Sequence, residues 1–168
     1  SSSHGDGLPH SNTGVAVSWT ASVDQPGLSG VSAYLVSLQT AAAPPVCGGT
    51  STGSTSTTLA APADGSYFVH VCALDLAGNA SSVAVGGPYV VDTAGPIGLV
   101  VSSSSHSVST WSNDNGVNFA FSGATDANGV AGYAIAFDQA AATVPACTTT
   151  QAGTTFTGSS SLDGNDWW

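Results

Sequence analysis

The chain has 168 residues and a formal net charge of −10, carried by aspartates alone, with no lysine or arginine. Without basic side chains nothing can neutralise phosphates, so the composition excludes nucleic acid as a partner and argues against binding to anionic membrane surfaces. Glutamate and methionine are also missing while Ser, Thr, Val and Gly abound, which favours strands joined by turns over helices and predicts an all-β fold.

Taken in chain order, seven segments alternate apolar and small polar residues, as half-buried strands do. In the first half, the residues expected to face the core are Val15, Val17, Trp19, Tyr34, Val36, Leu38, Tyr67, Val69, Val71, Ala73, Tyr89 and Val91. In the second half they are Leu99, Val101, Val117, Phe119, Phe121, Tyr133, Ile135 and Phe137. Two sheets packed face to face would bury these sets against each other.

The second half of the chain repeats the first at a distance of about 100 residues. The matching segments are 1–4 with 103–106, 12–15 with 114–117, 17–24 with 119–126, 29–34 with 128–133, and 45–47 with 145–147. We therefore expect two domains of one fold, 1–93 and 94–168. The first lacks the strand at 97–101 and the second lacks strands like 67–73 and 89–92, so we expect the chain to be a window on a longer array.

Three motifs carry a resemblance to a known family. They are the Tyr-x-Val-x-Val-x-Ala strand at 67–73, "DLAGNAS" at 75–81 and "GPYVVDTAGP" at 87–96. Together with a Trp in the segment at 15–19 and a Tyr at 34, they resemble the fibronectin type III and bacterial Ig-like tandem repeats of extracellular, adhesin-type surface proteins. The resemblance covers nearly the whole chain and implies tandem Ig-like antiparallel β-sandwiches, the second of them incomplete. It says little about function, because such modules serve many proteins.

The cysteines acquire a pairing from this resemblance. In the family fold the strand before Cys47 and the strand holding Cys72 are neighbours in one sheet, which implies a Cys47–Cys72 disulfide with Cys72 on the outer face. Cys147 matches Cys47, and its expected partner would lie beyond Trp168. Three free, buried cysteines are the alternative.

Calcium is a possible ligand of the aspartates at predicted loop ends and at the domain junction. These are Asp24, Asp75, Asp92 and Asp126. Related repeats bind calcium near such junctions, and the ion takes six to eight oxygen ligands. The spacing of a known calcium loop is absent, however, and aspartates also cap turns without a metal. We otherwise expect no cofactor.

Catalysis and sugar binding have weaker support. A Ser–His–Asp site could be written from the scattered histidines, but no G-x-S-x-G motif is present, so we expect no enzymatic activity. Trp111 and Phe68 could face a sugar, although Trp111 could equally cover an edge of the sandwich.

The sequence thus predicts a non-catalytic, secreted structural or adhesive module at the cell surface. Its expected partners are further repeats of the same parent chain, neighbouring subunits, or a cell-surface or polysaccharide ligand; no stretch is apolar enough for membrane insertion. Two alternatives stay open. The chain could be the accessory, carbohydrate-positioning module of a secreted enzyme, or a fibre subunit completed by strands from neighbouring chains.

Overall fold

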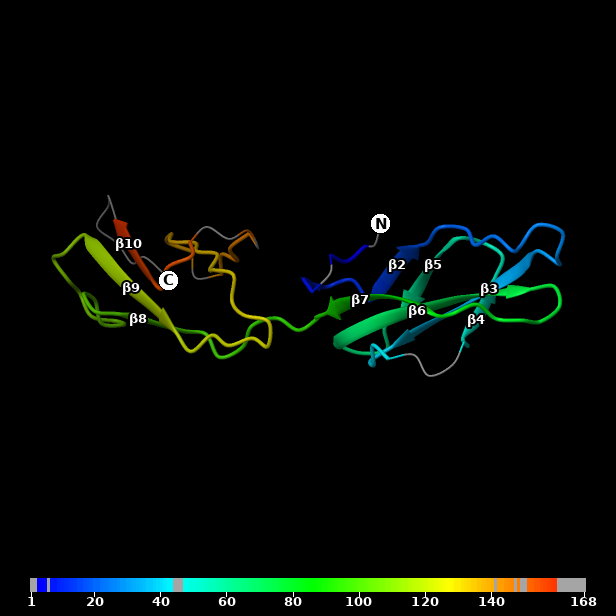
Figure 1. Cartoon of the computed structure of the whole chain (residues 1–168). Coiled ribbons are helices and arrows are strands. Elements are labelled where there is room, and N and C mark those ends of the chain that lie inside the picture. Colours follow the sequence, from blue (N-terminus) through cyan, green and yellow to red (C-terminus); the bar gives the residue numbers. More distant parts are fainter. Residues whose placement is uncertain are drawn as a thin grey trace. The chain divides into compact units, whose positions relative to one another are not determined.

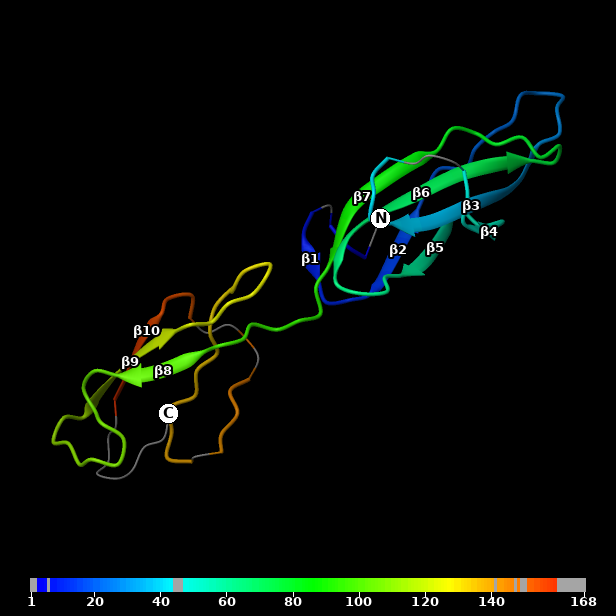
Figure 2. The same ribbon diagram turned by 90° about the horizontal axis from the view of Figure 1, so that it is seen from below.

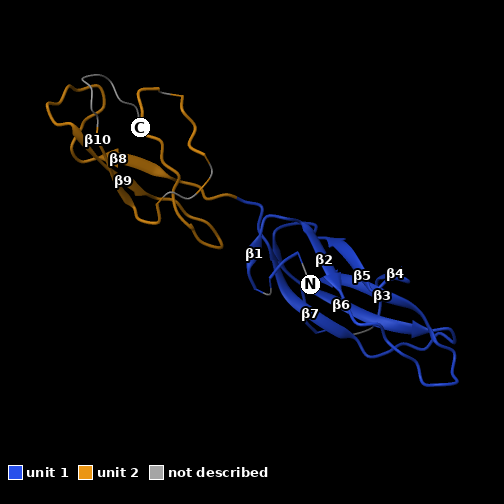
Figure 3. Cartoon of the chain, turned by 90° about the horizontal axis from the view of Figure 1, so that it is seen from above, with its two compact units in different colours: residues 1–94 blue, residues 95–168 orange. Residues whose placement is uncertain are grey.

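The computed structural model describes residues 3–5, 7–43, 47–140, 142–146, 148 and 151–159. The chain divides into two compact units, Ser1–Ala94 and Gly95–Trp168, which Figure 3 shows in different colours. This division falls one residue from the predicted boundary. Among the described residues there are strands, turns and loops but no helix, so the predicted all-β class is confirmed.

Unit 1 contains seven strands in two sheets (Figure 1). The strands are β1 (Pro9–His10), β2 (Gly14–Ser18), β3 (Val31–Gln39), β4 (Thr50–Thr52), β5 (Ser56–Ala60), β6 (Gly65–Asp75) and β7 (Ala84–Val91). The larger sheet has the order β1-β7-β6-β3-β4, and β2 pairs with β5 in the smaller one. Figure 2 shows the long strands β3, β6 and β7 side by side.

The core of unit 1 lies between these two sheets, as predicted. Its buried residues come from alternate positions of both sheets and are Val15, Val17, Tyr34, Val36, Ala61, Tyr67, Val69, Ala73, Tyr89 and Val91. The partly buried Trp19, Leu38 and Val71 pack against them, so every inward-facing residue predicted for the first half is confirmed. Alternation works here because the side chains of a strand point to its two faces in turn.

Strand β6 is buried on both faces between Val69 and Ala73. Cys72 lies on the face opposite to Val71 and Ala73, as alternation requires, yet it is only 2% exposed. The reason is the disulfide to Cys47, whose Cα lies 5.8 Å from that of Cys72 and which brings the segment after β3 onto this face. The predicted pairing is therefore present, and His70 on the same face is buried too.

Three strands of unit 1 were not predicted. β5 belongs to a Ser/Thr-rich run in which only Leu59 is strongly apolar, and β4 has no apolar residue at all. The two-residue β1 runs parallel to β7, with Pro9 opposite Val90 and His10 opposite Val91. These strands are held mainly by backbone pairing, which leaves little trace in a hydrophobic pattern.

Unit 2 has a single three-stranded antiparallel sheet in the order β10-β9-β8. Its strands are β8 (Val100–Ser103), β9 (Gly116–Ser122) and β10 (Thr155–Ser159). Val117, Phe119 and Phe121 of β9 are buried, and Tyr133, Ile135 and Phe137 pack against them as predicted. The segment 133–137 is not a ladder strand, however; it has an isolated bridge from Tyr133 to Gln151.

Leu99 and Val101 were expected to be buried, and this prediction is wrong. Leu99 is 53% exposed and Val101 is 43% exposed. In unit 1 the larger sheet covers its partner with β6 and β7, whereas the described residues of unit 2 place no such strands over β8 and β9. The inward face of β8 therefore stays open.

Removal of the disulfide should destabilise unit 1 selectively. We expect the double variant Cys47→Ala/Cys72→Ala to lower the free energy of unfolding of unit 1 by about 2–4 kcal/mol, because the bridge restricts the unfolded chain. Urea unfolding followed by NMR amide signals of each unit would measure it. The control is Cys147→Ala, which should leave unit 1 unchanged; equal losses in both variants would contradict the prediction.

Candidate functional site

A serine and the histidine after it tie the start of unit 1 to β2. The Ser3 hydroxyl lies 2.9 Å from His4 Nδ1, donates to the carbonyl of Gly14 at 2.8 Å and accepts the N–H of Ala16 at 3.0 Å. The other ring nitrogen of His4, Nε2, lies 2.8 Å from the carbonyl oxygen of Asn12. A carbonyl can only accept, so Nε2 carries the proton. His4 is 2% exposed.

Unit 2 contains the same arrangement 102 residues later. Ser105 Oγ lies 2.9 Å from His106 Nδ1 and accepts the N–H of Asn118 at 2.9 Å, while His106 Nε2 lies 2.9 Å from the carbonyl of Asp114. The carboxylate of Asp114 accepts the N–H of Gly116 at 2.9 Å, as the side chain of Asn12 does from Gly14 at 2.8 Å.

This serine–histidine pair is built for holding backbone rather than for attacking a substrate. A nucleophilic serine needs a histidine oriented by a third group on its far nitrogen, in most cases a carboxylate. Here the far nitrogen meets a backbone carbonyl in both units, and both serine oxygens also bind the following strand. The sequence showed the repeated SSSH, but not that its histidines close a loop eight residues long.

The predicted calcium ligands lie in separate turns, where they accept backbone N–H groups. Asp24 accepts from Gln25 and Gly30, each at 2.8 Å. Asp126 accepts from Asn128 at 2.8 Å, and Asp92 accepts from Ala94 at 3.2 Å. An aspartate that stabilises its own loop in this way is a common turn device.

Asp75 has the most elaborate set of partners. One oxygen accepts the N–H groups of Ala77 and Asn79 at 2.9 and 2.8 Å, and the other accepts Asn79 Nδ2 at 2.8 Å. Gly78 allows the turn because its φ of 90° is unfavourable for other residues. The hydrogen bonds from Asn79, its side chain first, lower the pKa of Asp75. The side chain and backbone of Thr93 likewise lower the pKa of Asp64.

A metal centre does not emerge from these carboxylates. Over the ranges that the structure describes, no three His, Cys, Asp or Glu side chains gather closely enough to hold one ion. The four predicted residues thus remain a hypothesis for calcium, with a demonstrated role as turn caps. Asp64, which joins β6's start to Thr93 after β7, was missed because the two are 29 residues apart in sequence.

The two candidate sugar-facing aromatics differ in exposure. Trp111 is 83% exposed in the loop between β8 and β9, so the idea that it covers an edge of the sandwich is wrong. Phe68 lies in β6 opposite Gln39 of β3 and is half-buried. They belong to different units, so the structure does not assemble them into one platform.

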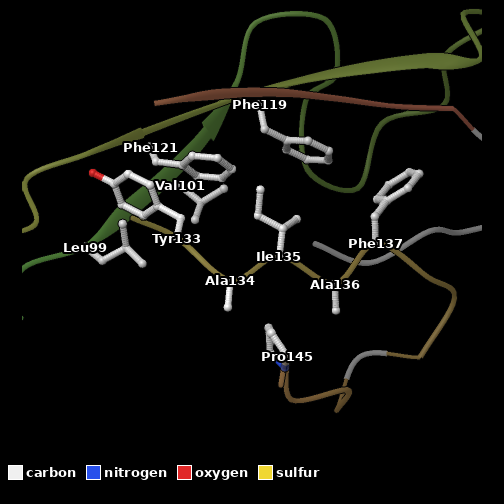
Figure 4. Close-up of a pocket in the computed structure, with 10 residues that line it drawn as sticks. All are labelled: Leu99, Val101, Phe119, Phe121, Tyr133, Ala134, Ile135, Ala136, Phe137 and Pro145. Carbon is white, nitrogen blue, oxygen red and sulfur yellow. The ribbon is translucent and has the colours of Figure 1, made fainter. Parts of the chain in front are cut away.

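The largest unexplained surface is an open apolar cavity in unit 2, of about 210 Å³. Figure 4 shows Val101, Phe121 and Ile135 pointing toward one another across it. Its lining is apolar throughout and consists of Leu99, Val101, Phe119, Phe121, Tyr133, Ala134, Ile135, Ala136, Phe137 and Pro145. Sequence alternation identified most of these residues but assigned them to a closed core.

Comparison of the chain with protein-family models, with curated proteins and with solved structures gave no match. None of the described residues belongs to a helix with the length and hydrophobicity to span a bilayer. The functional argument therefore depends on the geometry above.

The Asp75 turn should give unit 1 an acid-sensitive contribution to stability. Because the folded pKa of Asp75 is below its ordinary value of 3.8, its contribution is fully present above that pH and is lost as the pH falls through the lower folded pKa. We expect wild-type and Asp75→Asn stabilities to differ by a constant amount at neutral pH and to converge below about pH 4. Urea unfolding of unit 1 between pH 7 and pH 2 would measure this. Parallel curves at all pH values would contradict it.

Proposed function

We propose that both units are copies of one Ig-like sandwich of the fibronectin type III kind, and that the chain is a non-catalytic structural module of an extracellular protein. The strand connectivity of unit 1 supports the fold. Successive strands cross between the sheets, with β2 and β5 in one and β3, β4, β6 and β7 in the other. This crossing is the Greek-key pattern of Ig-like sandwiches.

The contacts of unit 2 support the repeat. Besides the serine–histidine pairs, the edge-to-face pair Trp19–Tyr34, with ring centroids 5.5 Å apart, has a counterpart in Phe121–Tyr133 at 5.3 Å. The bridge from Tyr133 to Gln151 likewise corresponds to the pairing of Tyr34 with Thr52. Two independent sets of contacts thus recur with the spacing of the sequence repeat.

An extracellular setting and a non-catalytic role have separate support. The Cys47–Cys72 disulfide is of the kind that persists in oxidising compartments. The only Ser–His pairs at hydrogen-bond distance among the described residues serve the backbone, as set out above.

The observation that carries a structural role is the parallel pairing of β1 with β7. Gly7 N–H donates to the carbonyl of Pro88 at 2.8 Å, and Asp92 N–H donates to the carbonyl of His10 at 2.9 Å. When unit 1 is pulled through its two ends, β1 is drawn toward its start and β7 toward its end. In parallel strands these directions are opposite, so all the bonds between them are loaded together in shear. A spacer that holds a partner away from a surface needs such resistance.

Force spectroscopy on the whole chain, pulled by its termini, tests this proposal. Forced unfolding reports the barrier to unfolding. We expect Asp92→Pro, which lacks the N–H that binds His10, to unfold unit 1 at a clearly lower force than Asp92→Ala, which keeps it. Both variants lose the Asp92 carboxylate and its bond to Ala94, so the difference isolates the backbone bond. Equal forces would overturn the load-bearing role.

The same recordings contain an internal marker for unit 1. Reduction should lengthen its unfolded contour by roughly 9 nm, since the bridge spans a separation of 25 residues and each residue adds about 3.6 Å.

A second candidate function, positioning on a polysaccharide, is favoured by the exposure of Trp111. An exposed aromatic ring offers an apolar face with an N–H donor at its rim. On this reading Trp111→Ala would weaken binding to insoluble cellulose, chitin or peptidoglycan by about tenfold or more, as loss of a binding hot spot does. Val108→Ala, in the same loop and 76% exposed, is the matched control. Pull-down measurements in which wild type and Trp111→Ala behave alike would remove this candidate.

A further inference from the structure

The open cavity of unit 2 has a covered counterpart in unit 1. Phe119, Phe121, Tyr133 and Ile135, which line the cavity, correspond by the sequence repeat to Val17, Trp19, Tyr34 and Val36. In unit 1 these residues belong to one closed core, with Val36 only 1% exposed. The cavity therefore marks the place where unit 1 has something that the described part of unit 2 does not.

The covering element in unit 1 is β6. It runs antiparallel to β3, with Ala73 opposite Tyr34, Val71 opposite Val36 and Val69 opposite Leu38. Transferred by the repeat, these positions lie beside Tyr133, Ile135 and Phe137. A strand placed there would set a small residue beside the Phe121–Tyr133 ring pair and branched apolar residues beside Ile135 and Phe137.

The chemistry of the cavity favours a strand over a small molecule. Binding sites for small molecules combine an apolar lining with a few convergent polar groups and measure about 300–1,000 Å³. This cavity is smaller, about 210 Å³, and its lining has no charged residue and no Ser, Thr, Asn or Gln. An added strand, in contrast, gains its affinity from main-chain hydrogen bonds and its specificity from alternate side chains.

We propose that unit 2 is a strand acceptor, and that its cavity takes an extended segment with the alternating pattern Tyr-x-Val-x-Val-x-Ala of β6, antiparallel to 133–137. The proposal rests on the equivalence of the two units inferred under the proposed function. It does not depend on the load-bearing role.

The test adds the strand as a peptide to the whole chain. The peptide has the sequence of residues 65–75 with Cys72→Ser, so that it cannot form a disulfide. We expect saturable binding of one peptide per chain by titration calorimetry, because unit 1 already contains its own β6. Amide hydrogen exchange at 133–137 should slow by about tenfold or more. A peptide that also carries Val69→Asn and Val71→Asn should not bind, since its inward positions are polar.

Two neighbouring residues of β8 provide the matched variants of the protein. Val101 lines the cavity and Val100 does not, although they are 43% and 56% exposed. Because both are exposed, replacement by Asn should leave the fold intact. We expect Val101→Asn to weaken peptide binding by about tenfold or more and Val100→Asn to leave it unchanged.

The possible failures are distinguishable. Absence of binding, or equal binding of both peptides, overturns the acceptor inference while the force measurements on unit 1 still stand. Protection at β10 or β8 instead of 133–137 overturns it as well, and with it the equivalence of the two units. A dimer of the chain that Val101→Asn dissociates would assign the cavity to a second copy and overturn the proposed occupant.

Discussion

Strand β6 is the element on which the rest of unit 1 depends. One of its faces supplies Tyr67, Val69 and Ala73 to the core, and the other holds Cys72 in the disulfide to Cys47. It also separates β3 from β7, so it determines the order of the larger sheet. With both faces buried and both edges paired, it has no solvent-exposed side that could tolerate a polar change. The contrast with unit 2 follows directly, because the residues that β6 covers in unit 1 line an open cavity there.

A second constraint is the absence of positive charge. Ten aspartates without a lysine or arginine cannot form ordinary ion pairs, so their charge must be satisfied by N–H donors or by water. The structure uses backbone amides in short turns, at Asp24, Asp75 and Asp126. Each carboxylate thereby stabilises a loop between strands. The loops and the acidic composition are two expressions of one arrangement.

The predictable part of the fold was the part governed by apolar alternation. Val15, Tyr34, Val69 and Val91 lie in the core because a side chain on every second position of a strand must face one side. The strands β4 and β5 escaped prediction because their Ser and Thr residues are held by backbone pairing. The burial of Leu99 and Val101 was wrong for another reason: alternation specifies the face of a strand but not whether a second layer lies over it. The roles of His4 and His106 needed coordinates, since their partners are backbone carbonyls, which every residue possesses.

The position of β6 and β7 at the end of unit 1 has a consequence for the order of folding. A chain emerges from synthesis or export with its N-terminal side first. β2 and β3 are then available early, but the strands that close the core over them follow some thirty to fifty residues later in the sequence. Pairings between such distant segments form slowly, because the intervening loop must close before any contact compensates for its lost entropy. Unit 1 therefore cannot complete its core until Val91 has emerged, and during that interval the apolar residues of β2 and β3 remain accessible to chaperones and to other chains.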